Sequence, residues 1–501
     1  MHYLPKKERT CVKTWNEEQL RILFKRCADV QFHEVKTVKP DDKEQEGMLL
    51  VYCENLCDMR IIQELILPKL HEGLEMGTVS VEPGAMDWDA MFSAWFPEDA
   101  TEQDVMDELF NGNLIVLKPG SGRLLYMQTS NRPERQPEES STEMTVNGPR
   151  DAFIEDLGVN IALIRKRLRT NTLCVEKYTL GRRSRTRVAL LYISDALDKT
   201  VARHISDKLQ SIDIDSVLSQ EELKILLVDE NFSFFPHMNF TTRPDYVTKS
   251  LVKGRFAIMM DGLPTVMLAP VNISYLITVA EDNHTPVSML FIQIWMRRAG
   301  LFITLLLPGF WVALTSYHQD QIPYPLLATI AVATSGTPLT GPLEILLMLL
   351  LFQFFLEAGS RLPSALGPSI SVVGGLIIGD AIIKAGLTSP ATLVIAAVSV
   401  TAQFTLVGGH LGLGIGLLRL FIFVLASFFG LFGFFTGAFY VLLYLANMRS
   451  FGVSFMSPMS PINWKDLWYV MFRLPRGRNK SNPELLHKQA DMTGRRGSSE
   501  Q

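Results

Sequence analysis

Six polar side chains in a long apolar part of the sequence are the residues best placed to do chemistry. They are Glu344, Gln353, Glu357, Arg361, Asp380 and Lys384. A charged side chain inside a bilayer costs roughly 2.5–3.5 kcal/mol on insertion scales, so it normally faces protein or water. We therefore predict that these six are intramembrane or pore-lining residues.

Four of the six form two pairs at helical spacing. Glu357 precedes Arg361 by four residues, and Asp380 precedes Lys384 by four. Side chains four residues apart are neighbours on a helix surface, so either pair can form a salt bridge. The spacing predicts ion pairs within the membrane or at its surface.

Residues 343–358 carry a polar stripe on an otherwise apolar helix. Gln353 lies one turn before Glu357, on nearly the same face, and Glu344 follows Gly341-Pro342 in the first turn. A carboxylate there complements the positive end of the helix dipole. The stripe either lines an ion path or joins helices in an oligomer, and the two interpretations are compatible.

Signatures of enzymes and metal sites are absent from the sequence. It contains no phosphate-binding G-x-x-x-x-G-K-[ST] loop, no G-x-G-x-x-G after a strand and no H-E-x-x-H. Cys53 and Cys57 have no second cysteine or histidine pair at zinc-ligand spacing, so we interpret them as half-buried thiols. We predict no catalytic residue, no metal and no cofactor.

Other polar residues have simpler explanations. The basic run Arg182, Arg183, Arg185 and Arg187 is typical of a solvated loop, with contact to lipid headgroups or a partner as the alternative. His318 and His410 lie beside membrane segments, and we interpret them as interfacial residues.

The distribution of charge along the sequence indicates which part of the chain holds the six polar residues. The 501 residues have a net charge of −4, which argues against a general nucleic-acid binder. Residues 299–448 carry 7 charges in 150 residues, about 5%, whereas about 26% of the other residues are charged. No aqueous domain is so poor in charge, so the chain joins an aqueous part to a part that lies in lipid.

The apolar part contains four stretches long enough to cross a hydrocarbon core, which takes about 20 helical residues. They are residues 299–316, 343–358, 391–407 and 421–448. Residues 322–335 and 369–386 are weaker and can be partial insertions, while 411–420 reads as an interfacial approach to the last span. We expect four spans, with six short spans as the alternative.

Basic residues flank both ends of this part. Arg297 and Arg298 precede the first span, and nine lysines and arginines follow Met448 against four acids. Since cytoplasmic flanks are rich in lysine and arginine, both termini are expected in the cytoplasm. Residues 1–9 have no apolar stretch, so we expect no signal peptide.

The aqueous part contains a weak internal duplication. Tyr52 and Tyr192 lie 140 residues apart in similar apolar strands, and Gly112 and Gly254 lie 142 apart in expected strand pairs. Helices alternating with short β-branched strands predict two similar α/β subdomains. We therefore expect a cytosolic α/β domain followed by an α-helical polytopic membrane domain. The expected boundaries are 1–130 and 151–285 for the subdomains, 131–150 for a linker, 286–448 for the membrane domain and 449–501 for a basic cytosolic tail.

From about Asn16 to Leu474, the sequence resembles the A subunits of GerA-type spore germination receptors. The resemblance rests on many separate segments. They include Gly148-Pro-Arg-Asp-Ala-Phe, Asn160-Ile-Ala-Leu-Ile-Arg-Lys-Arg-Leu-Arg, Gly181-Arg-Arg-Ser-Arg-Thr, Thr242-Arg-Pro-Asp, Asp261-Gly-Leu-Pro, Glu357-Ala-Gly-Ser-Arg-Leu-Pro and Val372-Val-Gly-Gly-Leu-Ile-Ile-Gly.

The resemblance implies a subunit of a nutrient receptor in the inner membrane of a bacterial spore. In that family the A subunit looks like an oligomeric, channel-forming component that releases cations when a germinant binds. Its expected partners are a transporter-like membrane subunit, a lipoprotein subunit, further copies of itself and the lipid bilayer, with no nucleic acid.

The sequence departs from the family pattern at several positions. Thr241-Thr-Arg-Pro-Asp replaces the usual Thr-Glu-Arg-Pro-Asp, and Leu349, Gln353 and Leu356 stand where the family usually carries extra Glu and Arg. Two other functions stay open: a secondary transporter, and a non-conducting scaffold of the receptor. The transporter is disfavoured because the membrane part lacks two similar halves with paired broken helices.

Overall fold

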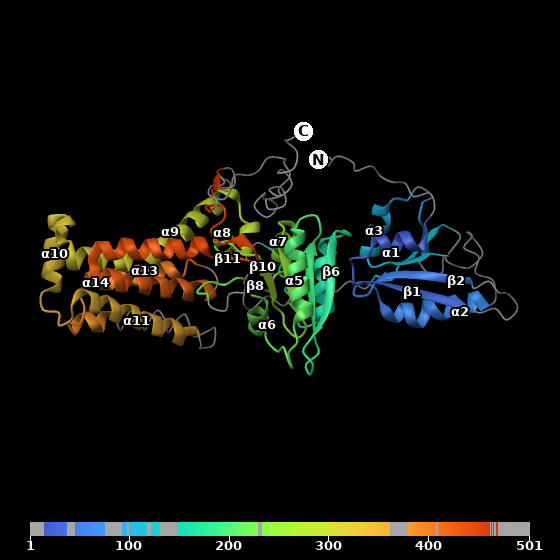
Figure 1. Ribbon diagram of the computed structural model, residues 1–501, viewed down its shortest axis with the longest axis horizontal. Helices are drawn as coiled ribbons and strands as arrows, with labels where there is room; N and C mark the ends of the chain where they lie inside the picture. Colours follow the sequence, from blue (N-terminus) through green and yellow to red (C-terminus); the bar gives the residue numbers. More distant parts are fainter. Residues whose placement is uncertain are drawn as a thin grey trace, which may run out of the picture. The chain divides into compact units, whose positions relative to one another are not determined.

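A computed structural model covers the chain and describes two compact units (Figure 1). The described residues are 15–37, 46–75, 93–97, 100–117, 122–130, 148–228, 233–360, 379–406, 409–460, 462, 464 and 467–468. The first unit, called the α/β unit, holds the described residues up to 228 and Met238–Pro270. The second, called the helical unit, holds residues 233–237 and the described residues from Val271 onward.

The first half of the α/β unit is built around a five-stranded antiparallel sheet of order β1-β2-β4-β5-β3. Its strands are β1 (Val30–Thr37), β2 (Glu46–Cys53), β3 (Ser93–Trp95), β4 (Leu114–Leu117) and β5 (Leu124–Met127). Its helices are α1 (Glu17–Leu23), the π-helix η1 (Ile61–Ile66), α2 (Leu67–Glu75) and α3 (Glu102–Phe110). Capping boxes at Asn16 and Thr101 begin α1 and α3, since each side chain accepts the N–H of the third helical residue.

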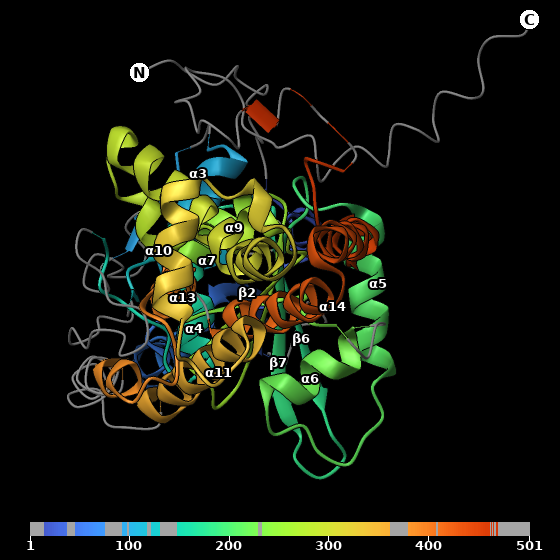
Figure 2. The ribbon, with the colours of Figure 1, turned by 90° about the vertical axis from the view of Figure 1, so that its left-hand side faces the viewer.

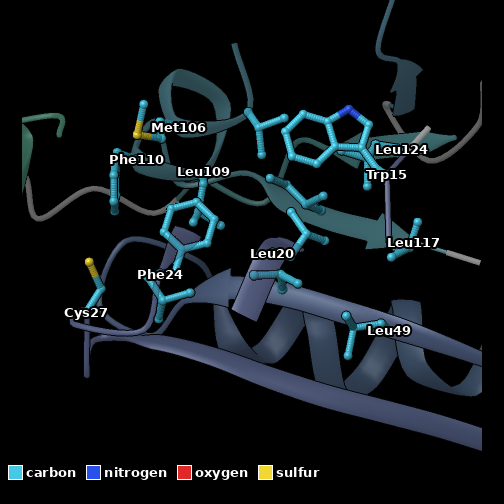
Figure 3. Close-up of a cluster of buried hydrophobic side chains, with 14 residues drawn as sticks. Trp15, Leu20, Phe24, Cys27, Leu49, Met106, Leu109, Phe110, Leu117 and Leu124 are labelled. Atoms are coloured by element: carbon cyan, nitrogen blue, oxygen red, sulfur yellow. The ribbon is translucent and has the colours of Figure 1, made fainter. Parts of the chain in front are cut away.

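Alternating strand residues give this first sheet two apolar faces. Figure 3 shows one of them, where the rings of Phe24 and Phe110 meet edge to face at 5.9 Å between α1, α3 and the sheet. The opposite face packs on η1 and α2 through Ile62, Ile66 and Leu70. Both faces are covered, so the inner strands β2, β4 and β5 are mostly buried, whereas the edge strand β1 exposes His33 and Glu34 and the edge strand β3 is half-buried.

The second half has the same strand order, β6-β7-β9-β10-β8, again antiparallel. Its strands are β6 (Leu173–Leu180), β7 (Thr186–Ile193), β8 (Asn239–Thr241), β9 (Phe256–Met260) and β10 (Val266–Ala269). Its helices are α4 (Leu157–Arg167), α5 (Lys199–Ser211), α6 (Gln220–Leu227) and α7 (Pro244–Val252).

The residues that suggested a duplication occupy matching places in the two sheets. Tyr52 lies in β2 and Tyr192 in β7, each the second strand of its sheet. Gly112 and Gly254 adopt φ of +90° and +82°, a region that favours glycine, just before β4 and β9. The expected strand pairs are present, as β4 with β5 and β9 with β10, and each glycine lies between the preceding helix (α3 or α7) and the first strand of its pair.

The helical unit contains the apolar helices. They are α8 (Ile273–Leu276), α9 (Val287–Tyr317), α10 (Tyr324–Thr334), α11 (Gly341–Ser360), α13 (Pro390–Gln403) and α14 (Gly409–Asn447). Short 3-10 turns lie at η3 (Ala280–Asn283) and η4 (Gln319–Gln321), and β11 (Arg449–Ser450) pairs with β12 (Val453–Ser454) after α14. Within the described residues, three helices are long and apolar enough to cross a membrane: α9, α11 and α14.

Helix α14 is folded back on itself at Gly430. That residue has φ of +60° and ψ of −139°, which no helix contains. A Cβ added at Gly437 would lie 3.2 Å from Cα of Ile422, so residues 431–447 return alongside residues 409–429. Figure 2 shows these two arms as neighbouring coils seen end-on.

The fold at Gly430 corrects the expected last span. Residues 421–448 are not one crossing, because residues 421–429 belong to the first arm and 431–447 to the second. Residues 411–420, expected as an interfacial approach, are the first half of the first arm. The weak segment 322–335 is α10, 11 residues long, and the first ten residues of 369–386 lie outside the described residues.

Candidate functional site

Glu344 is a buried carboxylate held by two helix N-termini. It lies in the first turn of α11 and is 1% exposed. Its Oε2 accepts the Ser389 N–H at 3.0 Å and the Thr392 hydroxyl at 3.0 Å, at the start of α13. Because the positive ends of two helix dipoles meet there, a negative charge is stabilised. The carboxylate therefore ties the start of α11 to the start of α13.

Glu344 also faces a cavity of about 1000 Å³ in the helical unit. The lining comes from the C-terminal end of α9, from α10, from the first turns of α11 and α13, and from α14. Its polar groups are mainly hydroxyls, among them Thr315, Ser335, Thr340 and Ser427, and Glu344 is the one charged residue among the described lining residues.

Gln353 and Glu357 lie on the other side of α11. The nine residues from Glu344 to Gln353 turn a helix by about two and a half turns, which places the two on opposite faces. Gln353 is half-buried and Glu357 is exposed, on the face that also presents Leu350 and Phe354. The structure thus separates Glu344 from the polar stripe at the C-terminal end of the helix.

Asp380 and Lys384 form an ion pair at 2.6 Å, with both side chains mostly exposed. Arg361, expected to pair with Glu357, lies outside the described residues. Among the five described candidates, Glu344 lies at the cavity, Gln353 and Glu357 lie on the opposite side of α11, and Asp380 and Lys384 pair with each other.

Arg419 is a buried charged residue that the sequence reasoning missed. The sequence predicts it in an interfacial segment, yet its side chain lies within the first arm of α14 and is only 5% exposed. Its Nη1 lies 3.5 Å from Oε1 of Gln403, the last residue of α13, and no carboxylate of the described residues pairs with it. The negative end of the α13 dipole complements the guanidinium, as the positive end complements Glu344. A lone arginine in an apolar segment was the signal that could have marked it.

The α/β unit contains one fully buried ion pair. Asp29, just before β1, accepts Nε and Nη2 of Arg165 from α4, both at 2.8 Å, and both side chains are 0% exposed. The remaining donors of Arg165 reach the carbonyl oxygens of Thr170 and Leu173, and its guanidinium lies 4.5 Å from the Phe110 ring centroid. Burial alone would lower the pKa of Arg165, but the charge of Asp29 outweighs this and raises it. Asp29 belongs to the first half and Arg165 to the second, so this pair and its four hydrogen bonds join the two halves of the unit.

The other flagged residues of the α/β unit have structural explanations. In the basic run, Arg182 pairs with Asp213 and Arg187 with Asp261, on the surface. Burial raises the pKa of the Cys57 thiol to about 11, and its Sγ lies 3.2 Å from the Gly112 carbonyl oxygen. No group of three or more metal-ligating side chains occurs in the part of the chain that the structure describes.

The two membrane-adjacent histidines end and begin helices. His318 follows the last residue of α9, and its Nδ1 lies 3.3 Å from the Ala313 carbonyl oxygen. His410 lies in the first turn of α14.

The chain is similar to a known protein family over most of its length. Residues 18–485 match the family described as Bacillus/Clostridium GerA spore germination protein. Spore germination protein XA of Bacillus anthracis is 37% identical over 474 residues, covering 94% of this chain and 96% of that protein. Spore germination protein KA of Bacillus subtilis (strain 168) is 32% identical, covering 91% and 84%. Spore germination protein GerLA of Bacillus cereus is 34% identical, covering 77% and 78%.

One solved structure is similar in part. The crystal structure of the N-terminal domain of the A subunit of the Bacillus megaterium spore germinant receptor GerK3 matches with a TM-score of 0.39 and 26% identity. It covers 50% of this chain and 92% of that one.

Proposed function

Since the chain belongs to the GerA family of spore germination proteins, we propose that it is the A subunit of a nutrient-sensing germinant receptor and forms a ligand-gated ion channel as an oligomer. On binding of the germinant, the channel opens and releases monovalent cations. No step of this function needs catalysis, so the chain is not an enzyme.

The exposed position of Glu357 carries this proposal. Its side chain lies on the outside of α11, a helix that is otherwise long and apolar enough to cross a membrane. A carboxylate facing hydrocarbon is costly, so this face of α11 must meet protein or water. In an oligomer the same face, with Gln353 one turn away, turns toward neighbouring subunits and lines an aqueous path.

Partners and location follow from the family. The receptor would combine this chain with a transporter-like membrane subunit and a lipoprotein subunit, in the inner membrane of the spore. The basic flanks at Arg297–Arg298 and after Met448 support a cytoplasmic position for both termini. The two sheets, which share a strand order, would be two similar cytosolic subdomains, and residues 286–448 would form the membrane domain.

Ligand binding in a partner subunit would shift the helical unit between closed and open states. A ligand shifts such an equilibrium only through its different affinity for the two states. The cavity beside Glu344 supports such a change, because it leaves α10 and α11 room to repack.

The proposal is tested by cation flux from liposomes that contain the purified receptor. We expect Glu357→Gln to reduce cation flux severalfold, because the variant removes the charge that concentrates cations on the path. Asp320→Asn is the matched control: Asp320 is an exposed acid in the turn η4, and its replacement should leave flux unchanged. Absence of conductance in the purified oligomer, with and without its partner subunits, would remove the channel from the proposal.

A further inference from the structure

Helix α9 is longer than α11 and α13, which pack on it. Its 31 residues measure about 46 Å at 1.5 Å per residue, against about 30 Å of hydrocarbon. Its C-terminal end is level with the start of α11, since a Cβ at Gly341 would lie 3.6 Å from Oγ of Ser316. The far end of α13 packs at Gly300, where a Cβ would meet the Ala402 carbonyl oxygen at 3.0 Å. The first three turns of α9 therefore project beyond α11 and α13.

One side of this projecting segment is covered within the helical unit. Leu290 and Ile294, one turn apart, are buried. Arg297 donates to the two carboxylate oxygens of Asp282 at 2.8 and 2.9 Å and to the carbonyl oxygen of Ile277. This side is fixed against the segment that precedes α9.

The opposite side is apolar and uncovered. Met289, Ile292 and Met296 are 59, 55 and 61% exposed. Beside them lies Trp295, partly exposed, with the Arg298 guanidinium 5.8 Å from its ring. Three long apolar side chains on little more than two turns form a patch that water does not favour.

The patch continues along α9 with a seven-residue repeat. Met289, Met296, Ile303 and Phe310 are each seven residues apart and all exposed, and Ile292 and Ala299 fall between them at the second position of the repeat. A 3.5-residue period keeps a seam facing a partner helix, as in coiled coils. Lipid can cover the part of the seam that lies level with α11 and α13, but about 30 Å of hydrocarbon is shorter than the roughly 46 Å of α9, so part of the seam needs another cover.

We infer that this α9 seam, defined by Met289, Ile292, Met296, Ala299, Ile303 and Phe310, is a contact between copies of the chain. The inference rests on the proposed oligomer and names the helix that holds it together. The seam contains no charged side chain, so two copies meet there without like-charge repulsion. Knobs-into-holes packing requires a partner helix with the same repeat, and α9 of a second copy supplies it.

The test is thiol cross-linking in membranes that contain the full-length chain. Met289→Cys and Met296→Cys should each give a cross-linked dimer with a short bis-maleimide. Phe291→Cys is the matched control, because Phe291 is exposed on the same turns but about a third of a turn or more from the seam. We expect at least tenfold more dimer from the seam cysteines than from the control or from the unsubstituted chain, whose described cysteines are buried.

A second measurement separates this inference from the oligomer itself. Ile292→Asp and Met296→Asp should each lower the mass of the detergent-extracted complex, while Phe291→Asp should not. A complex that keeps its mass in both seam variants and shows no seam cross-link overturns the inference and leaves the oligomer intact. A monomeric mass for the unsubstituted chain would instead contradict the proposed oligomeric function.

Discussion

The two units bury charged side chains in opposite ways. In the α/β unit, Asp29 and Arg165 neutralise each other through two bonds of 2.8 Å, and backbone carbonyl oxygens take the other donors. In the helical unit, Glu344 and Arg419 are buried apart, and each is held by neutral groups at one end of α13. In the first arrangement the two charges compensate each other, whereas in the second the compensation depends on the position of α13.

The two arrangements should respond differently when a neighbouring helix moves. A fully bonded buried pair resists water and holds two segments in one register, and it gives no response to movement elsewhere. A charge compensated only by a helix dipole loses its stabilisation when that helix shifts, since the effect of the dipole fades within a turn. A conformational change that moves α13 would therefore change the stabilisation of Glu344 and Arg419.

The largest effect is expected from breaking the buried pair. Arg165→Met leaves Asp29 buried without a cation, which should cost about 3–5 kcal/mol of local stability. The amides of Ala28 and Val175, which bond across the two halves, should then lose protection from hydrogen exchange. Hydrogen-exchange mass spectrometry on the full chain measures this loss.

The double variant Asp29→Leu/Arg165→Met is the control for that measurement. It removes both charges, so much of the protection should return. Equal loss of protection in the single and double variants would show that packing, rather than the charge of Asp29, holds the two halves together.

The next effect concerns Glu344. Glu344→Ala leaves the Ser389 N–H and the Thr392 hydroxyl without their acceptor, which should cost about 1–3 kcal/mol and lower the melting temperature of the detergent-extracted chain. Glu344→Gln keeps an acceptor oxygen and should lose clearly less. If the two variants melted at the same temperature, the negative charge at the two helix ends would be the stabilising element, rather than the hydrogen bonds.

Replacement of Arg419 should have the opposite effect on thermal stability. Arg419→Met replaces a buried cation that has no carboxylate partner among the described residues with an apolar side chain of similar length. The variant should keep or gain stability, up to about 1 kcal/mol, which corresponds to roughly 2–4 °C for a unit of this size. Thermal melting decides: a large fall in melting temperature would place Arg419 with Arg165, as a charge retained for stability.

The sequence predicts some features of these two units and misses others. The fall in charge density near residue 298 predicts the apolar part, and the matched positions of Tyr52 and Tyr192 predict the repeat. Both signals can be read from composition and residue spacing, which do not depend on contacts between distant residues. The fold at Gly430 could not be predicted, since apolar residues flank it on both sides and hydropathy does not register a reversal of the chain.

The candidate site was harder to predict than the fold. Glu344 was chosen for its place in a first helical turn, but its bonds to Ser389 and Thr392 join residues more than 40 apart in sequence. The pairing of Asp29 with Arg165 spans 136 residues and leaves no local pattern. Spacing rules find partners one turn away, as with Asp380 and Lys384, and contacts between distant elements escape them.

The smallest effect is a change in thiol reactivity that reports on the buried pair. Burial raises the pKa of the Cys27 thiol to about 11, and the same holds for Cys57. At pH 8 only about one such thiol in a thousand is ionised, so alkylation should be slow and should rise as the pH approaches 11. In Arg165→Met, the guanidinium charge that lowers the pKa of Cys27 is lost while the Asp29 charge that raises it remains, so the pKa of Cys27 should rise further. Cys57 is the internal control, because its Sγ contacts the Gly112 carbonyl oxygen. Slower labelling of Cys27 alone, followed by mass spectrometry, would show that the Arg165 charge acts on this thiol, while faster labelling of both thiols would mean that the whole first sheet opens.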